Sequence, residues 1–311
     1  MRQAKDYLIL VLKGAGMGAA DVIPGVSGGT IAFISGIYEE LIGSLKSINF
    51  KTLKLLFTAQ FASFFAAING WFLLSVFGGV AISIFSLAQL MKWLLTNYPI
   101  PVWSFFFGLI LVSAYYVVHS AGKLGLSGWI SFVAGVAIAW VITTISPAST
   151  PDALWFIFVA GSIGICAMIL PGISGAFILL LLGKYLYMIT AISELNIVVI
   201  LIFIAGAATG LILFSNLLSW LLKNYRTITI SLLAGFMIGS LNKVWPWKLT
   251  VTSITGSHGE LVPLTERNVL PAAYTAATGN GSSLALAVAL FLTGILILIV
   301  LETVGNKEKQ K

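Results

Sequence analysis

The stretch Pro24-Gly25-Val26-Ser27-Gly28 recurs 147 residues later as Pro171-Gly172-Ile173-Ser174-Gly175. At the same offset further residues match, in the pairs Gly14 and Gly161, Gly36 and Gly183, and Tyr38 and Tyr185. Proline removes a backbone donor and clashes with the preceding helical turn, and glycine adopts backbone angles that other residues avoid. Because both stretches lie in apolar sequence, each predicts a broken or re-entrant helical hairpin within a membrane.

A second set of matches continues the repeat at an offset of 127, pairing Trp93-Leu94-Leu95 with Trp220-Leu221-Leu222, Asn97-Tyr98 with Asn224-Tyr225, Gly108 with Gly235, and Ser113 with Ser240. The two offsets differ by 20 residues, which is about the length of one membrane crossing. An odd difference in the number of crossings inverts one repeat relative to the other, an arrangement common in transporters. We therefore expect two inverted repeats, about 8–147 and about 153–302.

Charged residues are scarce along the whole chain. Its 311 residues include 17 Lys and Arg and 10 Asp and Glu, which is 9% against roughly 25% in an ordinary soluble domain. The mean hydropathy is +1.04. Six windows carry no charge, and each exceeds the roughly 20 residues that cross a bilayer: 55–91, 93–122, 124–151, 153–183, 195–222 and 268–301. The sequence predicts an all-α, polytopic integral membrane protein that forms one membrane domain over 1–311.

The placement of Lys and Arg predicts the orientation of the chain. Basic residues near both ends, Arg2, Lys5 and Lys13 and then Lys307, Lys309 and Lys311, place both termini in the cytoplasm. The polar loop 244–282 mixes positive and negative charges and is expected outside. The apolar run 7–12 is too short for a signal peptide. The expected location is therefore the cytoplasmic (inner) membrane, with membrane lipids as partners and no nucleic acid.

The two Pro-Gly breaks are the candidate binding site. Backbone groups freed at membrane depth must line a polar cavity or be buried in protein. A helix that starts at each Ser-Gly would point its amide groups and its positive dipole end inward, which favours an anion. The hydroxyls of Ser27, Thr30 and Ser174 add hydrogen-bond donors. The alternative is that Pro-Gly only kinks each helix for packing.

Two charged residues lie close to these breaks. Asp21 precedes Pro24, and Met168 takes its place in the second copy. Its carboxylate could carry a proton, bind a cation, brace the loop through backbone N–H groups, or lie at the membrane interface. Lys184 occupies the place of Ile37 in the repeat, where it either extends toward the headgroups or approaches a phosphate.

Signatures of catalysis and of cofactors are missing from the sequence. It contains no Walker loop, zinc motif or nucleophile elbow, and His119 and His258 lack metal-ligand spacing. We expect no catalytic residues, no metal and no cofactor.

The segment Asp21-Val22-Ile23-Pro24-Gly25-Val26-Ser27-Gly28-Gly29-Thr30, with the later Leu170-Pro171-Gly172-Ile173-Ser174-Gly175, resembles the polyprenyl-phosphate transporter family. The resemblance covers about 10–300. It implies a flippase that moves undecaprenyl phosphate from the outer to the inner leaflet, recycling the lipid carrier for cell-envelope glycans. In the second copy Ala176 and Phe177 replace Gly29 and Thr30, so the first motif is expected to contribute more.

A lipid phosphate needs a polar midpoint for its headgroup while its tail stays in lipid. The hypothesis is that the phosphate path is lined by Gly25, Ser27, Gly28, Gly29, Thr30, Gly172, Ser174 and Gly175, with Pro24 and Pro171 as the helix breaks. Two rivals remain at this level. A secondary transporter of a small anion would use an enclosed aqueous cavity, and a lipid-phosphate enzyme would need a catalytic cluster.

Overall fold

The computed structural model describes residues 2–21, 27–145, 150–255 and 261–309. These residues form two compact units, one of residues 1–91 and 148–230 and the other of residues 92–147 and 231–311. Each unit therefore takes one segment from each half of the chain.

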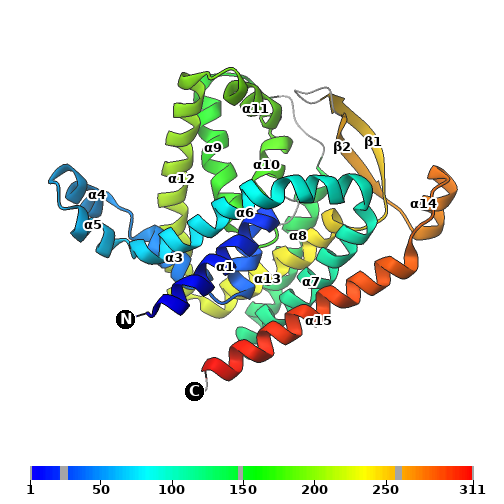
Figure 1. Cartoon of the computed structure of the whole chain (residues 1–311), viewed down its shortest axis with the longest axis horizontal. Helices are drawn as coiled ribbons and strands as arrows, with labels where there is room; N and C mark the ends of the chain where they lie inside the picture. Colours follow the sequence, from blue (N-terminus) through cyan, green and yellow to red (C-terminus); the bar gives the residue numbers. More distant parts are fainter. Residues whose placement is uncertain (1, 22–26, 146–149, 256–260, 310–311) are drawn as a thin grey trace. The chain divides into compact units, whose positions relative to one another are not determined.

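The first unit is helical, and Figure 1 shows its chain in blue, cyan and green. Its N-terminal segment contains α1 (Ala4–Asp21), α2 (Gly28–Ile34), α3 (Tyr38–Lys46), α4 (Phe50–Phe57), α5 (Phe61–Ala67) and most of α6 (Gly70–Asn97). The part of the first unit that comes from the second half of the chain contains α9 (Leu154–Ile169), α10 (Gly175–Leu181), α11 (Tyr185–Ser193) and α12 (Ile197–Asn224). Helices α9 and α12 pack along each other, and α2 contacts α9.

Close packing of α9 on α12 depends on the absence of side chains at the contact. A Cβ atom at Gly161 would lie 2.4 Å from the carbonyl oxygen of Phe203, and one at Gly206 would lie 2.0 Å from that of Phe158. Small residues let membrane helices approach until their backbones touch, where van der Waals packing holds them together. The two glycines therefore fix how closely these helices lie.

The second unit contains the remaining helices, α7 (Pro99–Ser120), α8 (Leu126–Thr144), α13 (Arg226–Val244), α14 (Pro271–Thr278) and α15 (Leu284–Lys309). Helix α15 packs along α7. The expected polar loop contains regular structure, because β1 (Lys248–Thr255) and β2 (Leu261–Asn268) pair as an antiparallel hairpin. The helical prediction thus holds for the membrane part, while the loop adds a strand pair that the all-α prediction did not include.

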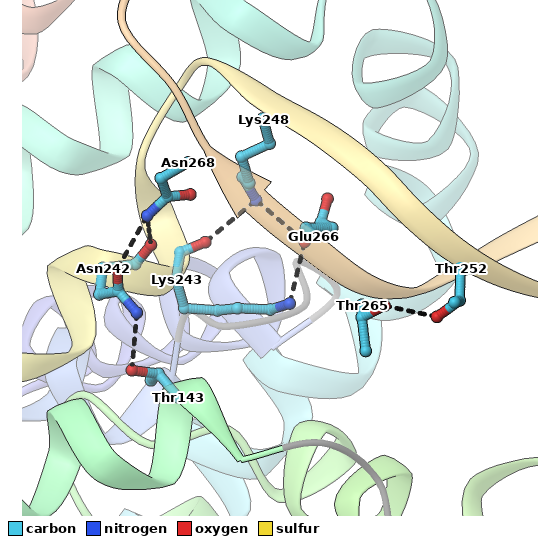
Figure 2. Close-up of polar contacts among 8 residues, drawn as sticks. All are labelled: Thr143, Asn242, Lys243, Lys248, Thr252, Thr265, Glu266 and Asn268. Atoms are coloured by element: carbon cyan, nitrogen blue, oxygen red, sulfur yellow. Dashed lines mark hydrogen bonds and ion pairs between the residues drawn. The ribbon is translucent and has the colours of Figure 1, made fainter.

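Figure 2 shows how polar side chains join the base of this hairpin to α13. The Glu266 carboxylate accepts from the ammonium groups of Lys243 at 2.9 Å and Lys248 at 3.4 Å, and Lys248 also lies 4.0 Å from the ring centre of Trp103. Burial lowers the pKa of Lys248 to about 8 despite the neighbouring carboxylate. Burial alone would raise the pKa of Glu266, but the two ammonium groups together hold it below its usual value.

Several helices are suited to a membrane by length and composition. In the part of the chain that the structure describes, α7, α8, α12 and α13 each meet both criteria. Two bent pairs raise the number to six if each pair counts as one span: α5 with the start of α6, bent by 75°, and α10 with α11, bent by 110°. The chain is a polytopic helical membrane protein, as the hydropathy predicts.

Segments that match in sequence also adopt similar local structures. Helices α2 and α10 both have 7 residues, α3 and α11 both have 9, and α6 and α12 both have 28. The ring centres of Trp93 and Tyr98 lie 5.5 Å apart, as do those of Trp220 and Tyr225. The inversion of one half relative to the other stays a prediction.

The 20 additional residues of the first half form the short helices α4 and α5. In the first half 23 residues separate α3 from α6, whereas 3 residues separate α11 from α12. Helices of 8 and 7 residues are each too short to cross a bilayer, which takes about 20 residues. The difference in offset suggested one additional membrane crossing in the first half. The extra residues instead form two short helices, neither of which is a full crossing.

Candidate functional site

The first Pro-Gly segment, described from Ser27 through α3, lies against the second, which runs from the end of α9 through α11, within the first unit. On the first segment Ser27 precedes α2 with extended backbone angles, and its hydroxyl accepts from the amide of Gly29 at 3.1 Å. This is N-terminal capping, which satisfies one of the free amides that a helix start exposes. Pro24 and Gly25, two residues of the predicted site, lie outside the described residues.

Asp21 braces the start of α2 from the end of α1. Its Oδ1 accepts from the amide of Gly28 at 2.7 Å. A Cβ atom at Gly28 would lie 2.4 Å from Asp21 Oδ2, so a side chain at position 28 would displace the carboxylate. Of the four roles open to Asp21, bracing the loop is the one that its contacts support directly.

On the second segment α9 stops at Ile169, ahead of Pro171. Leu170 is extended, and Gly172 has φ of +85°, a left-handed conformation that favours glycine. Ser174 precedes α10 with extended backbone angles, as Ser27 precedes α2, but it makes no side-chain capping bond. From the serine onward the two segments thus share a backbone plan but differ in their hydrogen bonds.

Side chains of the first segment satisfy the carbonyl groups at the end of α9. The Ser27 hydroxyl lies 3.2 Å from the carbonyl oxygen of Met168 and 3.1 Å from that of Leu170. The phenol of Tyr38 donates to the carbonyl of Ile169 at 3.2 Å. Met168 and Ile169 lie in the last turn of α9, whose carbonyls have no partners within the helix, whereas the Leu170 carbonyl also accepts from the amide of Ile173 at 3.4 Å. The single proton of the Ser27 hydroxyl serves one of its two neighbouring carbonyls at a time.

One further hydrogen bond links the two segments: the amide of Gly172 donates to Thr30 Oγ1 at 2.9 Å. Gly29 lies at the point of closest approach, where a Cβ atom would be 2.5 Å from the carbonyl oxygen of Ile169. The side chains of Ser27 and Thr30 are almost entirely buried, at 1% and 0% exposure. In this conformation their hydroxyls therefore bond to protein.

The predicted site residues divide into two groups. The structure brings Ser27, Gly29, Thr30 and Gly172 together at the contact of the segments, with Gly28, Ser174 and Gly175 at the adjoining helix starts. The sequence does not predict Tyr38 as a contact residue, although it recurs as Tyr185 at the same offset.

Lys184 lies apart from this contact, at the far end of α10. Its ammonium donates to the carbonyl of Thr150 at 2.9 Å and pairs with the carboxylate of Asp152 at 2.5 Å. The side chain is 1% exposed and lies 5.6 Å from the ring centres of Phe156 and Tyr187. Lys184 thus ties the turn after α10 to the segment before α9.

Over the described part of the chain, no group of three His, Cys, Asp or Glu side chains could hold a metal ion.

Comparison with known proteins adds an independent line of evidence. Residues 17–262 match a family described as undecaprenyl phosphate translocase-like. The chain belongs to that family. It is 45% identical over 302 residues to the polyprenyl-phosphate transporter of Vibrio cholerae serotype O1, covering 97% of this chain and 98% of the relative. It is 34% identical over 256 residues to the polyprenyl-phosphate transporter of Staphylococcus aureus, covering 76% and 86%.

These matches confirm the family resemblance that the two Pro-Gly motifs carry. No solved structure matches the chain.

Proposed function

We propose that this protein is a transporter that moves a polyprenyl phosphate, undecaprenyl phosphate, across the cytoplasmic membrane and so recycles the lipid carrier. Family membership and two relatives named as polyprenyl-phosphate transporters support the substrate class. The observation that carries the proposal is the direct contact of two broken helices through buried hydroxyl and amide groups. Proposed with it are transport from the outer to the inner leaflet, cytoplasmic termini and the absence of catalysis.

The proposed phosphate path is the contact between the two segments, lined by Gly25, Ser27, Gly28, Gly29, Thr30, Gly172, Ser174 and Gly175. We take the conformation described here as the closed state, in which the Ser27 hydroxyl bonds to the end of α9 and the Gly172 amide bonds to Thr30. When the segments separate, the Ser27 hydroxyl and the Gly172 amide lose their protein partners and become donors to phosphate oxygens. Hydrogen bonds to an ionised phosphate are roughly twice as strong as neutral ones, so the anionic headgroup compensates for the bonds that opening breaks.

This exchange also explains how a chain with so few charges handles an anion. An unpaired polar group in hydrocarbon costs several kcal/mol, on the order of 2–7, so an empty open site is unfavourable. When no lipid phosphate is bound, the polar groups of the two segments form hydrogen bonds with each other, and this removes the cost of leaving them unpaired. Asp21, held at the start of α2, is proposed to couple proton movement to the opening of this contact.

Leaflet-resolved transport in proteoliposomes tests the proposal. The accessibility of undecaprenyl phosphate in each leaflet is followed with and without a pH gradient, against protein-free liposomes. The double variant Ser27→Ala with Ser174→Ala is expected to transport several-fold more slowly than the wild type. Ser75→Ala is the matched control, because the Ser75 side chain is partly exposed and its hydroxyl donates to the carbonyl of Trp71 in the same helix at 2.8 Å.

Wild-type transport no faster than in protein-free liposomes would contradict the function itself. Normal transport by the double variant would contradict only the role of the hydroxyls. Release of phosphate from undecaprenyl pyrophosphate by the purified protein would instead favour an enzyme.

A further inference from the structure

The short helices α4 and α5 form a projecting hairpin in the first unit (Figure 1). Among the described elements, α4 packs chiefly against α5. Asn49 caps the start of α4 by accepting from the amides of Lys51 at 2.9 Å and Thr52 at 3.2 Å. Ala59, with φ of +55°, ends it, as the amide of Gln60 bonds to the carbonyl of Leu55 at 2.8 Å. The hairpin is therefore a defined structure and not an extended linker.

Polar groups surround the bend that joins α5 to α6. Asn69 donates to the Glu40 carboxylate at 2.9 Å and to the Ser44 hydroxyl at 3.2 Å, and Arg2 pairs with Glu40 at 2.5 Å. An open surface pocket of about 300 Å³ beside these groups is lined by Glu40, Gly43, Ser44, Ser47, Ala67 and Asn69. Partly exposed charged groups such as Arg2 and Glu40 do not face hydrocarbon, which favours a position of this bend at the level of the lipid headgroups.

The direction of α5 follows from the same bend. The axis of α5 makes an angle of 75° with the first part of α6. Helix α6 has 28 residues, a length of about 42 Å that is sufficient to cross a bilayer. If α6 runs across the membrane from the headgroup level, α5 lies nearly in the plane of the membrane.

The hairpin presents both positive charge and aromatic side chains. Lys51 and Lys54 are exposed on α4, and the sequence contains no Asp or Glu from residue 41 to residue 151. At the tip, Phe57 is 90% exposed and Phe61 is 64% exposed. Basic residues combined with large apolar ones are typical of helices that lie in the interface and bind anionic lipids.

We propose that the hairpin of α4 and α5 is an interfacial anchor that binds anionic phospholipid headgroups through Lys51 and Lys54. Phe57 and Phe61 enter the boundary of the acyl chains beside them. The second half of the chain has no counterpart, because only 3 residues connect α11 to α12. The anchor therefore attaches the first broken hairpin, and not the second, to one leaflet.

Depth-dependent fluorescence quenching tests this anchor. Cys166 is replaced by Ser, and Thr58→Cys, at the exposed hairpin tip, carries an environment-sensitive dye on the full-length protein. The protein is reconstituted in vesicles of phosphatidylcholine alone or with phosphatidylglycerol. Spin-labelled lipid is expected to quench the dye, more strongly when phosphatidylglycerol is present, while the aqueous quencher acrylamide has little effect. The same dye at Asn280→Cys, in the exposed loop after α14, is the control expected to be quenched by acrylamide.

The charge contribution is tested with Lys51→Gln together with Lys54→Gln, which is expected to abolish the added quenching by phosphatidylglycerol. Lys123→Gln together with Lys223→Gln removes two exposed lysines elsewhere and is expected to leave it intact. Quenching of position 58 by acrylamide in both kinds of vesicle would overturn the anchor, and an unchanged phosphatidylglycerol effect in the first double variant would overturn the role of the lysines. The experiment measures the depth of the dye in the membrane. Its result therefore supports or contradicts the anchor independently of whether the protein transports lipid phosphate.

Discussion

From Ser27 and Ser174 onward the two Pro-Gly segments have the same backbone plan, but they contribute different chemistry to their contact. Each has an extended serine before a 7-residue helix, followed by a glycine of positive φ, Gly36 or Gly183, and a 9-residue helix. The first segment supplies side chains to the contact, whereas the second supplies backbone carbonyls and an amide. Two copies of one motif thus form the two sides of a single contact. The first copy contributes through specific side chains, and the second contributes through its backbone.

The largest expected effect is at Gly29, where the segments come closest. Gly29→Val places a side chain within 2.5 Å of the Ile169 carbonyl oxygen, and because that neighbour is backbone it cannot rotate away. We expect a loss of stability on the order of 3 kcal/mol or more, measured by denaturant unfolding in detergent micelles, and loss of transport in proteoliposomes.

The matched change in the second copy is Ala176→Val, at the position that corresponds to Gly29. It already carries a Cβ atom, so we expect a much smaller loss of stability. Equal losses of stability in Gly29→Val and Ala176→Val would mean that close backbone approach is not specific to the first segment.

The next effect is at the two serines. Ser27→Ala removes the donor to the end of α9 and the acceptor for the Gly29 amide, which leaves buried groups without partners. We expect destabilisation of about 1–3 kcal/mol. Ser174 is also buried but makes no capping bond, so Ser174→Ala is expected to destabilise the protein less than Ser27→Ala, by under about 1 kcal/mol. Thermal unfolding of both variants in the same detergent compares them directly, and a larger loss for Ser174→Ala would reverse the assignment of roles.

Asp21 has no counterpart in the second segment, where Met168 takes its place. Asp21→Asn keeps an oxygen that can accept from the Gly28 amide, so the fold is expected to persist, with a weakened response of transport to a pH gradient. Asp21→Ala removes the acceptor as well, and we expect it to lower stability by about 1–2 kcal/mol. Normal transport by Asp21→Asn at every pH would exclude proton coupling through this residue and leave only the brace.

The sequence predicts the breaks themselves but not the partners of their polar groups. Proline and glycine determine locally where α9 stops, and a serine before a glycine is a local capping signal. The bond from Ser27 to Leu170 joins residues 143 positions apart, and no local rule specifies such a pair. The contact role of Tyr38 is hidden for the same reason.

Hydropathy also does not distinguish a crossing from a helix that lies in the interface. The α5 sequence, Phe61-Ala62-Ser63-Phe64-Phe65-Ala66-Ala67, is apolar, and it adjoins the apolar α6 within one uncharged window. Its 75° bend from α6 depends on Asn69, whose φ of +55° ends α5 and whose side chain bonds to Glu40. A left-handed asparagine between two apolar helices is a weak sequence signal, and so the sequence alone predicts a crossing for the 20 extra residues.

The smallest expected effect is at the turn after each short helix, where the first segment has Ile37 and the second has Lys184. Both side chains are buried, at 4% and 1% exposure. Lys184→Ile therefore gives the second turn the residue that the first turn already accommodates. It removes the ion pair with Asp152, whose side chain is 65% exposed, so no unpaired charge is left buried in the protein. We expect a change in stability of about 0–1 kcal/mol and nearly unchanged transport.

The reason for this small value is that Lys184 is only 1% exposed, and replacing a buried charge by an apolar side chain of similar volume is often close to neutral. Isoleucine also recovers part of the packing on Phe156 and Tyr187. Unfolding in detergent measures the stability term, and the proteoliposome assay measures transport separately. A variant that unfolds normally but loses transport would show that the ammonium at position 184 meets the substrate, which is the alternative that the sequence left open. That outcome would also require Lys184 to leave Asp152 during transport, and Asp152→Asn, which weakens the pair while keeping the ammonium, would then be expected to speed transport.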